Sequence, residues 1–306
     1  MANLIPAPDD SNVRSILARH GFPADLPMDY VPLEGSVNHT RLCGAVCIKL
    51  LKDWENVSDV YCELVATPAV RKIGALVPEL LAFDESSDLH PGPVVLWERG
   101  EGEALGNLTE VEDLQRVYVE LTEQARLWHE QLREIDDPNG WLDDPEPGDP
   151  TESFALSLDR MEASTRAWCE RTFTRLSEAK PGPDAFGNWD LHAHNVLIKN
   201  HRLSMILDWG DAGFGDPILN FTSFPAEFLP RVVEAFGVPD PDFVGRLIRE
   251  VLCYALNAYN TPDWPNLRHK GMKRWRSFER LYDQNLPDPW KHWLGDPPPC
   301  DNRSEH

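Results

Sequence analysis

Residues 188–217 read NWDLHAHNVLIKNHRLSMILDWGDAGFGDP and form the most informative stretch of the 306-residue sequence. Within it, two apolar runs at 195–199 and 203–207 flank the short polar segment 200–202. Two short apolar runs around a polar turn predict a β-hairpin. Because a hairpin returns the chain to the place where it started, we expect the residues just before and just after it to lie close together.

Three polar residues, Asp190, Asn195 and Asp208, flank this predicted hairpin. Phosphoryl transfer from a nucleotide requires a base that orients the attacking hydroxyl and accepts its proton, together with oxygen ligands that place magnesium on the phosphates. Magnesium binds carboxylate and amide oxygens while keeping several water molecules. The sequence has D-x-x-x-x-N followed by a predicted hairpin and a second Asp. This pattern supplies candidates for the base and for two magnesium ligands.

At these positions the sequence resembles the aminoglycoside phosphotransferase and choline kinase family, small-molecule kinases that are distant relatives of the protein kinases. The catalytic segment of that family usually reads H-G-D-L-H-x-x-N-[VI]-L, and its metal segment reads I-D-W-G-x-A-G-x-G-D-P. The matching residues here are Asp190, Leu191, His192, Asn195, Val196 and Leu197, then Asp208, Trp209, Gly210, Ala212, Gly213, Gly215, Asp216 and Pro217. The resemblance implies an O-phosphotransferase in which Asp190 is the base and Asn195 and Asp208 hold Mg²⁺.

The resemblance extends from about residue 33 to residue 222 and implies an α+β, bilobal protein-kinase-like fold. Residues 1–100 would form a small, β-rich nucleotide-binding lobe, and residues 101–306 a larger, mainly helical lobe for catalysis and substrate binding. Residue patterns agree with this layout. They predict strands at 41–51 and 92–98, a helix at 57–67 closed by Pro68, a helix at 109–132 with Thr109 as a possible N-cap, and helices at 154–176, 243–259 and 267–282.

The N-terminal part contains candidates for binding the phosphoryl donor, ATP or GTP. Lys49 lies in a predicted strand, and Glu63 lies on the following helix, where the resemblance places the partner that holds the phosphate-binding lysine by a charge-assisted pair. Residues 33–40 resemble the family's nucleotide loop, with Ser36 and Asn38 as binding candidates. A predicted hinge follows Trp97, and Glu98 and Gly100 are expected to offer backbone groups to the purine there.

Two residues depart from the family pattern. Asn188 stands where a His usually opens the catalytic segment, and Asn220 stands where an Asp usually follows D-P. In the family these positions brace the catalytic loop and do not touch the transferred group. Since Asn can still accept a hydrogen bond, we expect a change in rate without loss of the reaction.

Composition excludes several classes of partner. The sequence has 29 Lys and Arg against 51 Asp and Glu, a formal net charge of −22, which argues against nucleic acid because binding its backbone needs clustered basic residues. No apolar run reaches the ~20 residues of a membrane span. The scattered cysteines are expected to be reduced, and a cytoplasmic location with no membrane partner follows as the expectation.

Two other readings of the catalytic stretch stay open. His192 and His194 form an H-x-H pair that also occurs in zinc hydrolases. The replacements at Asn188 and Asn220 would also fit a non-catalytic, nucleotide-binding protein, although the intact Asp190, Asn195 and Asp208 argue against it.

The hydroxyl-bearing small-molecule acceptor is the least determined part of the prediction. Residues 134–152 hold eight acids and no base, which suits a cationic acceptor such as an aminoglycoside, whereas 267–280 is basic and leaves a neutral or acidic nucleoside or sugar-bearing antibiotic open. We expect an antibiotic-modifying kinase that gives resistance or self-protection. The alternative is a kinase of a primary metabolite such as an aminoalcohol or a sugar.

Overall fold

The computed structural model describes residues 4–30, 37–142, 155, 161–260 and 265–299, and side chains 257–271 are outside that description. The chain forms two compact units. The first comprises Met1–Val117, Leu127–Asp144 and Asn188–Phe214. The second comprises Tyr118–Arg126, Pro145–Gly187 and Gly215–His306. Each unit combines segments that are distant in the sequence.

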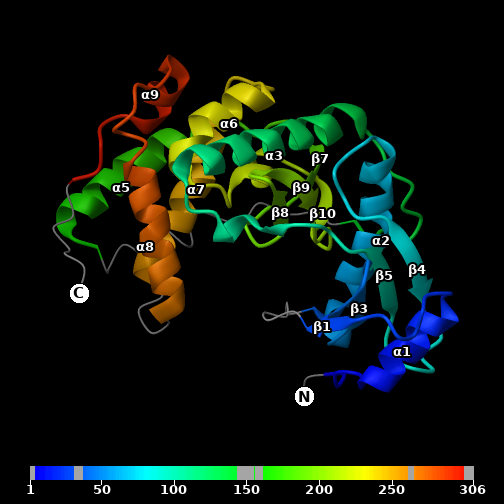
Figure 1. Cartoon of the computed structure of the whole chain (residues 1–306). Coiled ribbons are helices and arrows are strands. Elements are labelled where there is room, and N and C mark those ends of the chain that lie inside the picture. The colour runs from blue at the N-terminus through cyan, green and yellow to red at the C-terminus, as the bar shows by residue number, and fades with distance from the viewer. Residues whose placement is uncertain (1–3, 31–36, 143–154, 156–160, 261–264, 300–306) are drawn as a thin grey trace. The chain divides into compact units, whose positions relative to one another are not determined.

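A five-stranded antiparallel sheet is the centre of the first unit (Figure 1), with the strand order β1-β2-β3-β5-β4. Its strands are β1 (Met28–Tyr30), β2 (Asn38–Cys43), β3 (Val46–Leu51), β4 (Leu80–Asp84) and β5 (Val94–Glu98). Because successive side chains in a strand point to opposite faces, Val46, Ile48 and Leu50 share one face of β3, and Lys49 lies on the other.

The single strand predicted over residues 41–51 is wrong, because the chain turns back at Gly44. Cys43 pairs with Val46, so only Gly44 and Ala45 connect β2 to β3. Gly44 has a φ of +57°, a left-handed conformation that glycine adopts without steric cost. Its N–H donates to the Pro27 carbonyl at 3.0 Å, which holds the turn in place.

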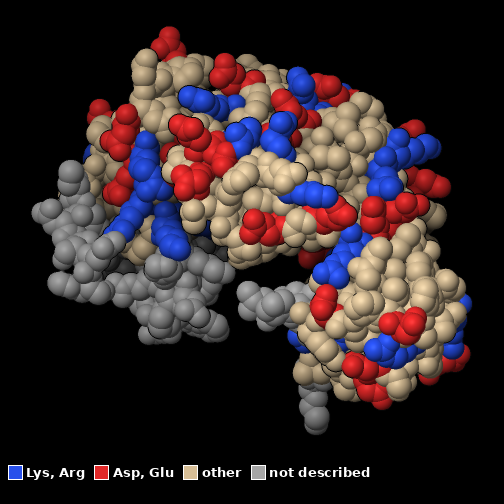
Figure 2. Space-filling view, in the orientation of Figure 1, with Lys and Arg blue, Asp and Glu red and all other residues tan. Residues whose placement is uncertain are grey.

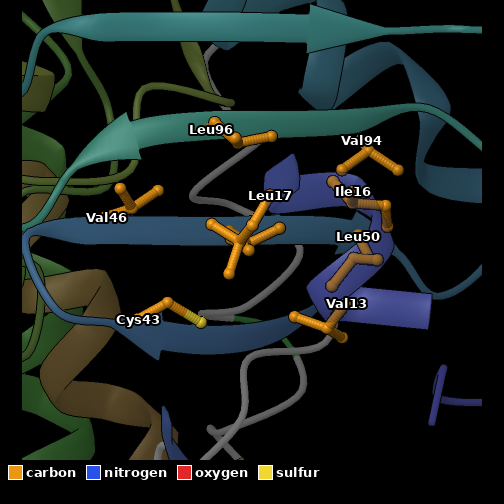
Figure 3. Close-up of a cluster of buried hydrophobic side chains, with 9 residues drawn as sticks. Val13, Ile16, Leu17, Cys43, Val46, Leu50, Val94 and Leu96 are labelled. Carbon is orange, nitrogen blue, oxygen red and sulfur yellow. The ribbon is translucent and has the colours of Figure 1, made fainter. Parts of the chain in front are cut away.

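One face of the sheet is covered by α1 (Asp10–Arg19), a helix that the sequence patterns above do not include. The Asp9 side chain caps it by accepting a hydrogen bond from the Asn12 N–H at 2.8 Å. The buried cluster that joins α1 to the sheet is drawn in Figure 3 and consists of Val13, Ile16, Leu17, Cys43, Val46, Ile48, Leu50, Val94 and Leu96. Burying a Val, Leu or Ile side chain contributes about 1.5–3 kcal/mol, so this cluster is a main source of stability.

The other face of the sheet meets α2 (Val57–Lys72), whose Val60 packs with Leu51, Val95 and Trp97. The prediction that Pro68 closes this helix is wrong, since α2 continues through it to Lys72. A proline inside a helix lacks the N–H for one backbone hydrogen bond but does not by itself end the helix. Packing of α2 on the sheet stabilises the helix more than the local preference of proline against helix destabilises it.

The hairpin predicted around residue 200 is confirmed. Strands β8 (Val196–Lys199) and β9 (Arg202–Ile206) pair in antiparallel fashion, and β6 (Glu103–Ala104) joins β8 to complete a three-stranded sheet. The turn is one residue shorter than predicted. It contains Asn200 and His201, with φ of 52° and 58°, the pattern of a type I′ turn that matches the twist of the strands.

Helices dominate the second unit. They are α5 (Ala163–Leu176), α6 (Leu229–Phe236), α7 (Phe243–Asn260), α8 (Pro265–Glu279) and α9 (Asp288–Leu294), while α3 (Val111–Gln131) contributes residues to both units. The core of this unit is aromatic, with the ring of Trp168 edge-on to Trp275 at 6.0 Å and to Phe278 at 6.2 Å. The predicted helix at 243–259 is confirmed within one residue.

Three helix boundaries differ from the sequence patterns. The helix α3 begins after Glu110 with no side-chain cap, so Thr109 is not its N-cap. The helix α5 begins at Ala163, and most of the predicted segment before it lies outside the described residues. The helix α8 ends at Glu279, three residues before the predicted end. Boundary errors of this size are expected where no strong cap marks a helix end.

The remaining elements are short. They are the strands β7 (Ala185–Asn188) and β10 (Ala212–Gly215) and the 3₁₀ helices η1 (Trp54–Asn56), η2 (Leu105–Asn107), η3 (Pro217–Phe221) and η4 (Ala226–Phe228). None of the helices in the described part of the chain has the length and apolar character needed to cross a membrane. Figure 2 shows acidic and basic side chains interspersed over the face that it views.

Candidate active site

Lys49 and Glu63 form a close ion pair in the first unit. The alternation along β3 turns Lys49 toward α2, where Glu63 is almost fully buried at 3% exposure. Lys49 Nζ lies 2.7 Å from Glu63 Oε1 and 2.9 Å from Oε2. Burial would lower the pKa of Lys49, but the charges of Asp208 and Glu63 outweigh it and raise the pKa above its ordinary value. Lys49 therefore stays cationic.

Asp208 meets the same lysine from the segment after β9. Its Oδ1 lies 3.3 Å from Lys49 Nζ, and about half of its side chain is exposed (51%). Asp208 has a φ of +58°, a left-handed conformation that few non-glycine residues adopt. Such backbone conformations persist only where the surroundings hold them, and they cluster at functional sites.

Asp190 and Asn195 belong to one tight loop before β8. Asn195 Nδ2 donates to Asp190 Oδ2 at 2.9 Å and to the Asp190 carbonyl at 3.1 Å. The hairpin closes behind them, because the Leu207 N–H donates to the Asn195 carbonyl at 2.7 Å. Since the amide nitrogen of Asn195 is used within the loop, Asn195 Oδ1 is the side-chain atom left to act as a ligand.

The pKa of Asp190 is raised above its ordinary value. Partial burial is the main cause, and the negative charge of Asp208 adds to it, while His192 and the hydrogen bond from Asn195 act in the opposite direction. A raised pKa makes a carboxylate a stronger proton acceptor. The environment of Asp190 is therefore suited to base catalysis.

His192 contacts both the loop backbone and Asp190. The His194 N–H donates to His192 Nδ1 at 3.2 Å, and His192 Nε2 lies 3.5 Å from Asp190 Oδ2. The rings of His192 and His194 have centroids 5.8 Å apart at an interplanar angle of 75°. Among the described residues, no group of three His, Cys, Asp or Glu side chains is arranged to hold a metal ion, so this pair gains no further zinc ligand there.

Asn188 and Cys62 contact the same segments, and the residue patterns did not indicate these contacts. Asn188 is fully buried, and its amide bonds the backbone of both Asp190 and Asp208. Cys62, which precedes Glu63 on α2, lies with Sγ 3.1 Å from the Ala212 carbonyl and 3.4 Å from the Trp209 carbonyl. In the sequence, the only sign of these contacts was that Asn188 stands where the family usually has a His that braces the catalytic loop.

The other predicted nucleotide-binding residues are less engaged with this cluster. Ser36 lies outside the described residues. Asn38 opens β2, and its Oδ1 is buried without a hydrogen-bond partner among the residues described. The carboxylate of Glu98 lies 3.4 Å from Arg71 Nη1 and accepts from the Glu79 N–H at 3.2 Å, so its side chain has a structural contact.

Gly100 lies between β5 and β6, against the β8–β9 hairpin. A Cβ on this residue would clash with Leu197 Cδ1 and would lie 2.8 Å from Met205 Sδ. The absence of a side chain at position 100 therefore allows the predicted hinge segment to pass close to the hairpin that carries Asn195 and Asp208 at its ends.

Comparison with known proteins gives the family. Residues 52–245 match the model of the phosphotransferase enzyme family APH. The chain belongs to this family. The match covers more than half of the sequence and includes Glu63, Asp190, Asn195 and Asp208, so this protein is a phosphotransferase enzyme and the resemblance inferred from residues 188–217 is confirmed.

Solved structures of other phosphotransferases share the fold. The GDP complex of the F108L mutant of aminoglycoside 2′-phosphotransferase-IIIa is 16% identical, with a TM-score of 0.61 over 90% of this chain and 99% of that one. A choline/ethanolamine kinase family protein from Mesorhizobium loti is 18% identical, with a TM-score of 0.59 over 93% and 97%. None of the curated proteins matches the sequence. The predicted α+β kinase-like fold, with an N-terminal sheet and a helical C-terminal region, is confirmed.

Proposed function

We propose that this phosphotransferase moves the γ-phosphate of ATP or GTP to a hydroxyl of a small molecule. The observation that carries the proposal is the cluster in which Lys49 Nζ lies 2.7 Å from Glu63 and 3.3 Å from Asp208, in the same unit as the bonded pair Asp190 and Asn195. Phosphoryl transfer depends on positioning of the reacting groups and on electrostatic stabilisation of the phosphate charge. These residues provide a candidate base, candidate metal ligands and a candidate phosphate-binding cation.

Asp190 is the proposed general base. Its carboxylate is held by Asn195, and its pKa is raised by burial and by Asp208. In this role Asp190 accepts the proton of the attacking hydroxyl as the new bond to phosphorus forms. The hydrogen bond from Asn195 keeps the carboxylate in one orientation, which reduces the entropy lost when the acceptor binds.

Asn195 and Asp208 are the proposed ligands of Mg²⁺, and their chemistry fits that ion. Each provides an oxygen, from the half-exposed carboxylate of Asp208 and from Oδ1 of Asn195. Mg²⁺ is commonly held by one or two protein oxygens together with water and substrate phosphates. When bound, the ion would neutralise phosphate charge, while Asp208 and Asn195 fix its place relative to Asp190.

Lys49 is the proposed phosphate-binding cation, and Glu63 holds it. A lysine that pairs with a buried carboxylate keeps its charge and a defined direction. Structural relatives support a nucleotide donor, since they include one phosphotransferase in complex with GDP and another in a ternary complex with ATP. Asn38, Glu98 and Gly100, with Ser36, remain proposed as the nucleotide loop and hinge.

The proposed acceptor is an antibiotic-like compound, an aminoglycoside or a nucleoside or sugar-bearing antibiotic. Support comes from structural relatives that were solved in complex with streptomycin, gentamicin and kanamycin. The relative named as a choline/ethanolamine kinase family protein supports the alternative, an aminoalcohol kinase. The role proposed for the first case is resistance or self-protection.

Some charged side chains in the two segments considered for acceptor binding already have partners within the protein. Asp137 accepts a hydrogen bond from the Leu142 N–H at 2.8 Å, so one of the acids at 134–152 stabilises its own loop. Arg274 stacks on the ring of Tyr254 at 4.7 Å, and Arg280 pairs with Glu227. These contacts weaken both the argument from acidic residues for a cationic acceptor and the argument from basic residues for a neutral or acidic one. An assay must therefore identify the acceptor.

The test is a panel of acceptors offered with ATP and with GTP. Aminoglycosides, nucleoside antibiotics, aminoalcohols and sugars are incubated with the enzyme, and the mass gain of one phosphoryl group is measured on each acceptor. We expect transfer to at least one antibiotic, and a rise in inhibitory concentration in a sensitive bacterial host that depends on Asp190. Transfer only to an aminoalcohol or sugar would support the alternative, and no transfer to any acceptor would contradict a catalytic role.

A further inference from the structure

Asn188, the last residue of β7, bridges the two segments that carry Asp190 and Asp208. Its Oδ1 accepts a hydrogen bond from the Asp190 N–H at 2.9 Å, and its Nδ2 donates to the Asp208 carbonyl at 2.9 Å. The side chain is fully buried, so water does not compete for either bond. One amide group thus joins the backbones of two residues that are 18 positions apart (208 − 190).

The contact at Asp208 involves a backbone in an uncommon conformation. Asp208 has a φ of +58°. The left-handed region is sterically unfavourable for L-residues, so the surrounding contacts must hold the peptide there. The bond from Asn188 Nδ2 fixes the carbonyl of Asp208, which limits rotation of the peptide that follows the proposed metal-binding side chain.

At Asp190 the side chain of Asn188 accepts a hydrogen bond, whereas at Asp208 it donates one. The Asp190 N–H lies in a half-buried turn, and Asn188 Oδ1, two residues upstream, accepts its hydrogen bond at 2.9 Å. A second backbone contact runs beside the bridge, since the Trp189 N–H lies 3.4 Å from the Asp211 carbonyl. The side-chain amide of Asn188 and this backbone contact thus link the same two segments.

We propose that Asn188 is a positioning residue whose amide sets the placement of the base Asp190 relative to the metal-binding carboxylate Asp208. This inference rests on the proposed roles of those two residues. Asn188 acts through them and touches neither phosphate nor metal. The task needs one acceptor and one donor on a short side chain, and Asn provides both.

The central variant is Asn188→Leu, which keeps the approximate size of the side chain and removes both hydrogen bonds. Losing the contact that orients a metal ligand commonly costs about 10- to 100-fold in metal affinity or activity. We expect the affinity for ATP or GTP with Mg²⁺ to fall about 10-fold, while the affinity for the nucleotide without Mg²⁺ changes less than about twofold. A merely structural role would not separate these two affinities.

The experiment is titration calorimetry of ATP and of GTP with and without Mg²⁺. It compares the wild type with Asn188→Leu and with Asn188→Ser, whose hydroxyl is too short to make both bonds and which stays available if the Leu variant does not fold. Thr122→Val is the matched control, because Thr122 is also fully buried and its Oγ1 donates to the Tyr118 carbonyl at 2.7 Å. The control should keep the wild-type response to Mg²⁺.

The outcomes separate the inference from the proposed function. If the wild type gains affinity from Mg²⁺ and the Leu and Ser variants gain equally, the inference about Asn188 is wrong and the proposed function stands. If the wild type binds both nucleotides equally well with and without Mg²⁺, the proposed metal site fails and the inference fails with it. A selective loss of the Mg²⁺-dependent part in the Asn188 variants supports the proposal.

Discussion

At the scale of single residues, the site depends on a few polar contacts between side chains from different segments. Lys49 contacts both Glu63 and Asp208, and Asn195 contacts Asp190. Each contact constrains a charged group whose position matters in phosphoryl transfer. Substitutions at these residues should therefore affect binding of the metal, binding of the nucleotide and turnover in separable ways.

Asp208 and Asn195 should differ in how strongly they control the response to Mg²⁺. Asp208→Ala removes a charged ligand, so we expect weaker binding of the Mg²⁺–nucleotide complex and loss of turnover. Asn195→Ala removes a neutral ligand and the bond to Asp190, so we expect a higher Mg²⁺ requirement with little change in the affinity for free nucleotide. Turnover measured across a Mg²⁺ series, with calorimetry, checks both. Identical Mg²⁺ dependence in wild type and variants would refute these roles.

Part of this site could be predicted from the sequence and part could not. The fixed spacing of Asp190, Asn195 and Asp208 around a hairpin is local information, and the alternation along β3 places Lys49 on the α2 side. The bridge made by Asn188 depends on where the Asp208 carbonyl comes to lie, which is a tertiary property. Residue patterns therefore identified the charged groups, and the resemblance marked position 188 as a brace of the catalytic loop, but the contact of Asn188 with the Asp208 carbonyl could not be predicted.

At the scale of elements, local rules failed where tertiary packing decides. The short helix α1 is stabilised by packing Val13, Ile16 and Leu17 on the sheet, and its sequence alone gives a weak signal. Gly44 breaks an apolar run that reads as one strand, and α2 continues through Pro68 because the sheet supports it. The β8–β9 hairpin was predicted because its two strands and its turn lie next to each other in the sequence.

Pro68 in α2 gives a prediction about stability. It is exposed, it lacks the N–H that would bond the Leu64 carbonyl, and its ring crowds that carbonyl. We expect Pro68→Ala to raise the free energy of unfolding by about 1–3 kcal/mol, given the helix preference of Ala over Pro. Differential scanning calorimetry measures the change in Tm. A lower Tm would mean that restriction of the unfolded chain by Pro68 dominates.

At the scale of the whole molecule, the second unit contains a buried ionic network around Arg246 on α7. Arg246 is 1% exposed and bonds Asp216, Asp240 and the Lys180 carbonyl. Buried charges of this kind tolerate loss of a partner poorly, because the remaining charge is left without compensation. The network joins segments that are distant in the sequence, so the stability of this unit should respond to its protonation.

Asp240 should make stability depend on pH in the acid range. The hydrogen bond from Arg246 holds the pKa of Asp240 below its ordinary value of 3.8. The unfolded chain therefore takes up this proton first as the pH falls, so the stabilisation is present above about pH 3.8 and is lost below it. We expect Asp240→Asn to be less stable than wild type at neutral pH, with the difference narrowing in acid.

Urea unfolding at pH 7 and near pH 3 measures this difference, at conditions bracketing the ordinary pKa of an Asp. Asp283→Asn is the control, because Asp283 is an exposed acid in the same unit. A gap between wild type and Asp240→Asn that stays constant across this range would contradict the linkage.

The most direct test of the account is the turnover of Asp190→Asn, a substitution that keeps the shape of the side chain and removes its basicity. With the acceptor identified by the panel and the preferred nucleotide, we predict that kcat falls at least ~10²-fold, while calorimetry shows a nearly unchanged affinity for the Mg²⁺–nucleotide complex. Near-normal kcat in the folded variant would contradict the assignment of Asp190 as the base and, with it, the central claim.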